Sequence, residues 1–278
     1  MAILLRGLFL FLLWPNLLQS PISVAAMEPP LIPAKFAGME PEKIWEQANE
    51  LYRNSDLENA LQGYLYLAQL GIQNGYLFYN LGNTFFRLGQ TGKAVLWYER
   101  AVEYLPRSGD LKFNLKYARN KLSDEEYQVP EHGGTIGFLI RLHNSFNLAE
   151  SLWITLGWFW GWSLCLLIPM LTRTERWKAR LRIPCWSLGI AFILSSLSTG
   201  LKTHQYEWVS EAIVMDSAVE VKTGPGKDFS TSFSLHEGTK VRIVQRQGDW
   251  SRLILPGNTT FTGWIPDRAI EMIRLPTP

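Results

Sequence analysis

The chain has 278 residues, a formal net charge of +2 and 12 tryptophans, and 19% of its residues are charged. Because the charge is nearly balanced and no long basic face appears, the composition gives no reason to propose nucleic-acid binding. The two cysteines, Cys165 and Cys185, both fall in hydrophobic runs, so no disulfide framework is expected in the other segments.

The first 26 residues have the parts of a secretory signal peptide. Arg6 precedes the apolar run 7–18, and the small residues of "SVAA" offer a cleavage site after Ala26. An uncleaved N-terminal anchor is the alternative, and it too would export the chain that follows. A Pro-rich linker is expected over residues 27–40.

Residues 41–121 contain an internal repeat whose period is 34, so that Ala48 aligns with Gly82 and Tyr64 aligns with Tyr98. This segment resembles a short tetratricopeptide (TPR) array, with two repeats and a closing helix at 111–121. The second copy has the marked residues of the TPR pattern at Phe78, Leu81, Gly82, Phe85, Gly89, Ala94, Tyr98, Ala101 and Pro106.

TPR arrays hold peptides or partner proteins on the concave face of their first helices. The resemblance therefore implies a partner-binding groove, in which aromatic rings beside guanidinium groups suit an extended or helical peptide with some acidic character. Alternatively, several of these rings cover neighbouring helices. The residues that the resemblance assigns to the groove are Trp45, Asn49, Tyr52, Arg53, Tyr79, Asn83, Phe86 and Arg87.

Two long runs without a charged residue follow, at 152–171 and 183–201. At about 1.5 Å of rise per residue, each reaches roughly 30 Å as a helix, which is the thickness of the hydrocarbon core. They predict two transmembrane helices, the first over 148–171, although two buried core helices are the alternative. No Asp, Glu, Lys, Arg or His lies in either run, so the pair is expected to anchor the chain rather than to form a transport path.

The segments around these runs indicate their orientation. A linker is expected over 122–147, and its apolar part, Ile136–Leu142, is expected to lie along the membrane surface. Asn147 and Glu150 are spaced for a capping box at the start of the first helix. The stretch 172–182 (TRTERWKARLR) has five basic residues and one acid, which predicts a cytoplasmic loop. Both flanking domains would then face the exterior, which in a bacterium is the periplasm or cell surface.

Residues 210–274 contain five short β-branched runs separated by Gly, Pro and Asp, which indicate a small β-barrel. The runs are "AIVMD", "AVEVKTG", "KVRIVQRQ", "WSRLILP" and "FTGWIPD". Their order resembles a bacterial SH3-like domain, a family that often contacts cell-wall peptides or neighbouring proteins. The residues that carry this resemblance are Gly224, Pro225, Glu237, Gly238, Trp250, Gly263, Trp264 and Pro266.

Residues with catalytic or metal-binding spacing are missing from the sequence. The four histidines, His132, His143, His204 and His236, have no metal-ligand spacing. Neither a G-x-S-x-G motif nor a phosphate loop is present. We therefore expect a protein without enzymatic activity, cofactor or metal ion.

The whole order, from signal peptide through TPR array and membrane hairpin to SH3-like domain, resembles the TPR-bearing proteins of the Bat aerotolerance operons (the BatE type). The resemblance implies partners, namely von Willebrand A-domain membrane proteins and a MoxR-type ATPase. The expected function is a membrane-anchored periplasmic adaptor in the inner membrane that binds partners in its TPR groove. The alternatives are a peptidoglycan tether that acts through the SH3-like domain and a structural spacer without specific ligands.

Overall fold

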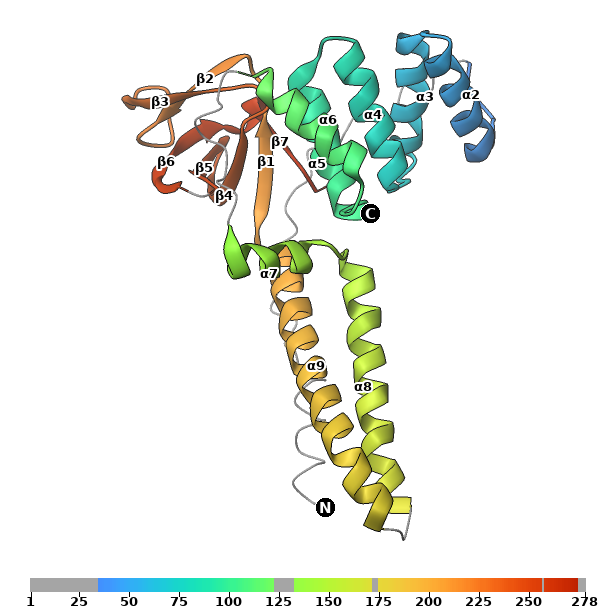
Figure 1. Ribbon diagram of the computed structural model, residues 1–278. Coiled ribbons are helices and arrows are strands. Elements are labelled where there is room, and N and C mark those ends of the chain that lie inside the picture. The colour runs from blue at the N-terminus through green and yellow to red at the C-terminus, as the bar shows by residue number, and fades with distance from the viewer. Residues whose placement is uncertain (1–34, 123–132, 172–174, 257, 275–278) are drawn as a thin grey trace. The chain divides into compact units, whose positions relative to one another are not determined.

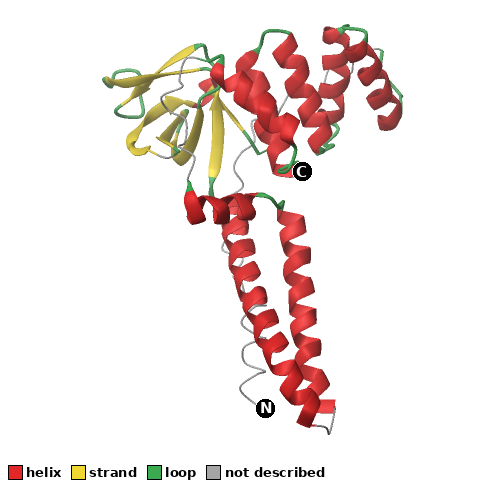
Figure 2. Cartoon of the chain, viewed as in Figure 1, coloured by secondary structure: helices red, strands yellow, loops and turns green. Residues whose placement is uncertain are grey.

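The computed structural model describes residues 35–122, 133–171, 175–256 and 258–274 (Figure 1). All of these residues belong to one compact unit, Ile32–Pro278. The predicted signal peptide and most of the predicted linker at 27–40 lie outside the described residues. Helices and strands occupy separate segments of the chain, with the strands following the last long helix (Figure 2).

The first part of the chain folds into five helices, each of which packs against the next. Asn74 caps one of them by accepting hydrogen bonds from the backbone N–H groups of Tyr76 and Leu77, at 2.8 and 3.4 Å. Ser55 and Gly89, which are one repeat period apart, both have a positive φ, of 63° and 78°, so the turn recurs with the repeat. We call these helices the helical array: α2 (Pro41–Arg53), α3 (Leu57–Gln69), α4 (Gly75–Arg87), α5 (Thr91–Tyr104) and α6 (Gly109–Asn120).

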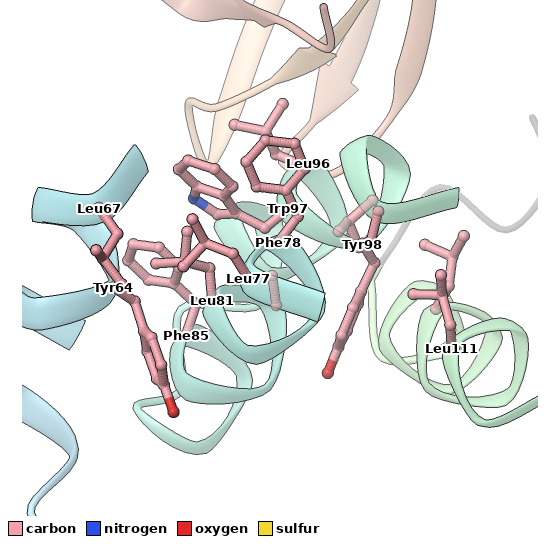
Figure 3. Packing of buried hydrophobic residues seen from close by; sticks show 14 of the residues in the cluster. Tyr64, Leu67, Leu77, Phe78, Leu81, Phe85, Leu96, Trp97, Tyr98 and Leu111 are labelled. Carbon is pink, nitrogen blue, oxygen red and sulfur yellow. The ribbon is translucent and has the colours of Figure 1, made fainter. Parts of the chain in front are cut away.

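Residues that share a repeat position form the core of the helical array (Figure 3). Ala60 and Ala94 are fully buried, as are Tyr64 and Tyr98. Gly82 allows a close approach between α4 and α5, because a Cβ atom at this position would lie 2.4 Å from the Tyr98 ring. Residues that are one period apart in the sequence therefore have the same place in the packing of the core.

The core also includes a residue from the segment that was predicted to be a linker. Phe36 is fully buried, and a Cβ atom at Gly63 would lie 3.0 Å from its ring. The prediction of a linker over residues 27–40 was therefore wrong for the C-terminal end of that segment. Burial of this large apolar ring stabilises the contact between this segment and α3.

Two long helices, α8 (Leu148–Leu171) and α9 (Glu175–Trp208), pack against each other and contain the two apolar runs. Both are long and apolar enough to cross a membrane, by length and composition. In each helix, only 6% of the apolar 18-residue stretch that could span a membrane is buried inside the structure. The core helix of a soluble protein would be mostly buried. The shorter helix α7 (Gly134–Asn144) precedes them, where the surface-lying segment was expected.

The ends of the long helices agree with one prediction and differ from another. The backbone N–H of Asn147 donates to the Glu150 carboxylate at 3.0 Å, and the N–H of Glu150 donates to Asn147 Oδ1 at 2.8 Å, which confirms the capping box. By contrast, the segment 172–182 is not a loop throughout, because α9 begins at Glu175. Arginine and lysine favour helices, so the basic segment continues the helix that follows it.

The last part of the chain, which we call the β domain, is a seven-stranded antiparallel sheet with the strand order β3-β2-β6-β5-β4-β1-β7. The five predicted runs correspond to β1, β2, β4, β5 and β6, whereas β3 and β7 were not predicted. Ile213 of β1 and Ile273 belong to the core of the helical array rather than to that of the β domain. The strands are β1 (Ser210–Val214), β2 (Ala218–Lys222), β3 (Thr231–His236), β4 (Lys240–Gln247), β5 (Trp250–Leu255), β6 (Asn258–Pro266) and β7 (Ile270–Met272).

We expect the substitution Gly82→Ala to destabilise the protein by about 1–3 kcal/mol, because the new methyl group overlaps the Tyr98 ring. A lower thermal unfolding midpoint of the full chain in detergent micelles would measure this effect. Gly109→Ala is the matched control, since a Cβ atom there has no neighbour within 4 Å. Equal midpoints for the two variants would contradict the packing described above.

Candidate functional site

A groove of about 460 Å³ runs along the helical array. This volume lies within the range of about 300–1,000 Å³ that is usual for ligand sites. It contains aromatic rings, two amides and one cation, and no carboxylate. The lining residues are Tyr52, Asn83, Phe86, Arg87, Tyr98, Phe113, Asn114 and Tyr117.

A set of three hydrogen-bonded side chains occurs twice in the array. In the first set, Asn49 Oδ1 accepts from the Tyr64 hydroxyl at 2.7 Å and from Asn80 Nδ2 at 3.0 Å. In the second, Asn83 Oδ1 accepts from Tyr98 at 2.7 Å and from Asn114 at 2.9 Å. Every member of the second set lies one repeat period after its counterpart. These amide bridges fix the spacing of α2, α4 and α6.

Burial raises the pKa of both tyrosine hydroxyls in these bridges above an ordinary value that already leaves them protonated at neutral pH. It raises the pKa of Tyr64 to about 12, against a smaller opposing effect of its hydrogen bond to Asn80. The pKa of Tyr98 is raised further, again mainly by burial. Both hydroxyls therefore remain hydrogen-bond donors throughout the physiological pH range.

Aromatic rings form the open part of the groove on α6. Phe113 is 70% exposed and Tyr117 is 52% exposed. Their rings stack with centroids 6.4 Å apart, and Tyr117 contacts Phe86 edge-on at 5.6 Å. Lys121 Nζ lies 4.9 Å from the centroid of the Phe86 ring. An apolar surface beside a cation is thus left uncovered among the described residues.

Arg87 also lines the groove, and the turn after α2 holds it in place. Its guanidinium donates to the Tyr52 carbonyl at 3.2 Å and to Ser55 Oγ at 3.0 Å. The guanidinium carbon also lies 4.8 Å from the centroid of the Tyr52 ring. The cation is therefore held in one place and still lines the groove.

Four of the eight predicted groove residues line this groove: Tyr52, Asn83, Phe86 and Arg87. The other four, Trp45, Asn49, Arg53 and Tyr79, do not. The rings of Trp45 and Tyr79 instead pack against Tyr64 and Tyr98, at 5.8 and 6.1 Å between centroids, and Asn49 lies in the first amide bridge.

Four lining residues were not predicted: Tyr98, Phe113, Asn114 and Tyr117. Two of them follow from the predicted groove residues through the repeat, because adding 34 to positions 79 and 83 gives positions 113 and 117. Asn114 lies one period after Asn80, which was not among the predicted groove residues.

A second set of polar residues joins the helical array to the β domain, and we call it the junction. Arg100 of α5 has a side chain that is only 3% exposed. It donates to Glu271 Oε1 at 2.8 Å and to the carbonyls of Met272 and Ile273 at 2.8 and 2.9 Å. Its guanidinium carbon lies 4.4 Å from the centroid of the Trp97 ring. A buried cation of the array thus depends on acceptors from the β domain.

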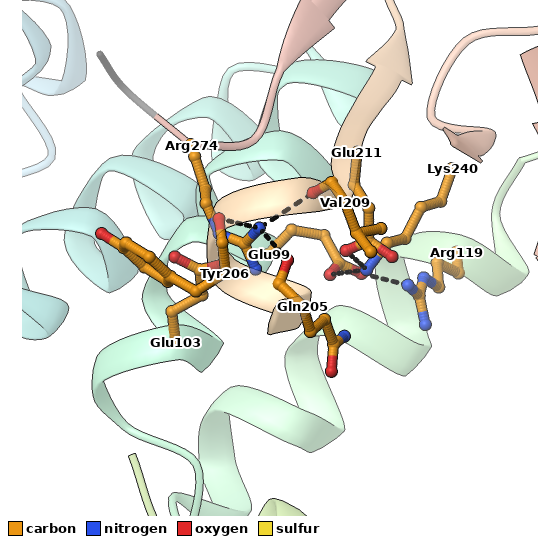
Figure 4. Close-up of polar contacts among 9 residues, drawn as sticks. All are labelled: Glu99, Glu103, Arg119, Gln205, Tyr206, Val209, Glu211, Lys240 and Arg274. Atoms are coloured by element: carbon orange, nitrogen blue, oxygen red, sulfur yellow. Dashed lines mark hydrogen bonds and ion pairs between the residues drawn. The ribbon is translucent and has the colours of Figure 1, made fainter. Parts of the chain in front are cut away.

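Next to Arg100 in the junction, Glu99 forms buried ion pairs (Figure 4). Its carboxylate contacts Arg119 of α6 and Lys240 of β4, and Lys240 also contacts Glu211 at 2.8 Å. Burial alone would raise the pKa of Glu99, but Lys240 and Arg119 outweigh it and hold that pKa below its usual value. The two carboxylates likewise hold the pKa of Lys240 above its usual value, against the effect of burial.

A fourth cation of the junction, Arg274, holds the end of α9 (Figure 4). Its Nη1 donates to the carbonyls of Gln205, Tyr206 and Val209 at 2.9, 3.0 and 2.9 Å. Its Nε donates to Glu103 of α5 at 2.7 Å. The last carbonyls of a helix have no partner within the helix, and a cation is favourable there. One side chain thus connects the array, the long helix α9 and the segment after β7.

Within the part of the chain that the structure describes, no group of three or more His, Cys, Asp or Glu side chains could hold a metal ion. A comparison of the chain with protein-family models and with curated proteins finds no match in either.

We expect Glu99→Gln to lower the stability of the full chain at pH 7 by about 1–3 kcal/mol, because Lys240 and Arg119 lose a buried anionic partner. Since the folded-state pKa of Glu99 lies below 4.5, wild type itself loses this contribution as the pH falls through that pKa. The cost of the substitution should therefore shrink between pH 7 and pH 4. Thermal unfolding midpoints of both proteins at the two pH values measure it.

Glu220→Gln is the control for this measurement, because Glu220 also pairs with a lysine but is exposed. It should change the midpoint little at either pH. A cost for Glu99→Gln that is the same at pH 7 and pH 4 would contradict the role given to its charge.

Proposed function

We propose that this protein is a membrane-anchored adaptor, whose helical array is a TPR array that binds a partner protein in the groove described above. The observation that supports it most is the exposed aromatic surface of α6, which faces open space in a groove of about 460 Å³. Exposed aromatic rings of this kind are typical anchors in protein interfaces.

The lining residues favour a particular kind of partner segment. Phe86, Phe113 and Tyr117 offer an apolar surface for an aliphatic or aromatic side chain. Arg87 lies over the ring of Tyr52 and Lys121 over the ring of Phe86, and both cations favour an acidic residue in the same segment. Asn83 uses its Oδ1 in the amide bridge, so it connects α4 to α6 as well as lining the groove.

The hairpin of α8 and α9 supports the anchored state, because both helices have the length and composition of membrane spans. We propose the inner membrane of a bacterium, with the helical array and the β domain in the periplasm and the basic segment 172–182 in the cytoplasm. The proposed partners are von Willebrand A-domain membrane proteins that act with a MoxR-type ATPase, in an aerotolerance or stress-related complex.

The groove can be tested by in-cell cross-linking and pull-down of the tagged full chain. We expect the double variant Phe113→Ser plus Tyr117→Ser to recover at least about tenfold less of the A-domain membrane proteins, since two interface anchors are lost. Both side chains are exposed, so the fold should persist. Quantitative mass spectrometry of the recovered proteins measures the change.

Tyr76→Ser plus Leu70→Ser is the matched control, because these residues are 62% and 47% exposed and do not line the groove. Equal recovery by wild type and both double variants would rule out the groove as the partner site. Recovery of peptidoglycan fragments by all three proteins, without A-domain proteins, would instead favour a wall tether acting through an SH3-like β domain.

The orientation has its own test, in a variant whose two cysteines, Cys165 and Cys185, are replaced by serine. We expect a membrane-impermeant maleimide to label Lys116→Cys, in the array, in cells whose outer membrane is permeabilised. It should label Arg180→Cys, in the basic segment, only after lysis, because that segment would lie in the cytoplasm. The reverse labelling pattern would overturn the proposed orientation without affecting the groove.

A further inference from the structure

A second, larger cavity of about 590 Å³ lies between the helical array, the segment that joins α7 to α8, and the end of α9. We call it the junction cavity. It is distinct from the groove, because the two share no lining residue. Its charged lining residues are Glu99, Glu103, Lys112, Arg141, Lys202, Glu211, Lys240 and Arg274.

The carboxylates in this cavity already have cationic partners. Lys240 contacts both Glu99 and Glu211, and Arg119 contacts Glu99 from outside the cavity. Glu103 is paired with Arg274 at 2.7 Å. The acidic side chains therefore have their charge balanced before any ligand enters.

Two cations of the cavity, Lys112 and Arg141, form no ion pair among the described residues. A third, Lys202, interacts with the Glu150 carboxylate outside the cavity only over a longer distance than an ion pair. Lys202 donates to the carbonyls of His143 and Phe146, at 2.5 and 2.8 Å, and so holds the end of α7 against α9. The side chains of Lys112 and Arg141 are exposed and make no hydrogen bond within the described residues. The cavity thus has an excess of positive charge, and the side chains of Lys112 and Arg141 can donate hydrogen bonds to a ligand.

The cavity lies at a defined depth along the two long helices. Leu148, which lines it, precedes the apolar run that begins at Leu152 by four residues, or about 6 Å of helix. Lys202 directly follows the run that ends at Leu201. In a bilayer the headgroup layer extends about 5–7 Å beyond each face of the hydrocarbon core. If α8 and α9 span the membrane, the cavity therefore lies at headgroup level.

An apolar surface adjoins this cationic cavity on α7, the helix that contributes Arg141. Four of its side chains are large, apolar and between 47% and 65% exposed: Ile136, Phe138, Leu139 and Leu142. An exposed apolar helix beside cations at this depth is the arrangement by which proteins bind the surface of an anionic membrane.

We propose that the junction cavity binds a phosphate-bearing anion, with the headgroup of an anionic phospholipid as its source. Lys112 and Arg141 would contact the phosphate, since guanidinium and ammonium groups donate hydrogen bonds to its oxygens. The acyl chains would lie along the apolar side chains of α7. This inference rests on the membrane span of α8 and α9 and is independent of the groove.

The test uses the full chain, purified and delipidated in detergent, and native mass spectrometry to detect bound molecules. Three probes are compared: phosphatidylglycerol, phosphatidylcholine and glycerol 1-phosphate. We expect phosphatidylglycerol to be retained in preference to phosphatidylcholine. The double variant Lys112→Gln plus Arg141→Gln should lower this retention by about tenfold or more, because two cations at the headgroup are lost.

Lys116→Gln plus Arg268→Gln is the matched control, since it removes one lysine and one arginine that are exposed and do not line the cavity. It should retain phosphatidylglycerol as wild type does. Retention of glycerol 1-phosphate without phosphatidylglycerol, lost in the cavity variant, would support the anion site with a soluble phosphate as its source. Equal retention of both lipids, or equal losses in the two double variants, would overturn the proposal. Because the groove residues are unchanged in every variant, neither result depends on partner capture.

Discussion

Two adjacent charged residues on α5, Glu99 and Arg100, are buried, and the rest of the structure depends on how they are paired. A buried charge without a partner is strongly destabilising, so each requires its partners to stay in place. Those partners lie mainly in the β domain: Lys240 for Glu99, and Glu271 for Arg100. The helical array and the β domain therefore cannot separate without exposing or isolating these charges. The junction cavity is lined by residues from both domains and so depends on this pairing.

The same repeat that builds the array also explains why its open surface is on α6. Asn80, the residue equivalent to Asn114 one period earlier, bridges back to Asn49 of α2. The rings equivalent to Phe113, those of Trp45 and Tyr79, each pack against a tyrosine of the following helix. In the last copy no such helix follows within the described residues. Phe113 and Tyr117 therefore have the aromatic rings of a helix-packing surface, but no described helix packs over them. This makes them available to another molecule.

Much of the fold could be predicted because its determinants are close in sequence. The period of the repeat gives the helices and the contact of Gly82 with Tyr98, and the capping box needs only Asn147 and Glu150. Strand β3, "TSFSLH", was missed because it lacks a β-branched run, and Phe36 was missed because it lies outside the repeat. For the groove, the repeat contained the missing information at positions 113 and 117, one period after Tyr79 and Asn83. The junction could not be predicted in this way, since Arg100 and Glu271 are 171 residues apart and no local pattern pairs them.

The long separation within the junction has a consequence for the order in which the protein is made. Arg100 leaves the ribosome about 170 residues before the three acceptors that it needs, and both long apolar helices are translated in between. At typical synthesis rates this interval lasts roughly 10–30 s. During that time the newly synthesised array has Arg100 without its acceptors and an apolar surface, including Trp97, that is not yet covered. Its maturation therefore depends on the translation of the β domain, and a chain that ends before β7 would keep a buried Arg100 without these acceptors.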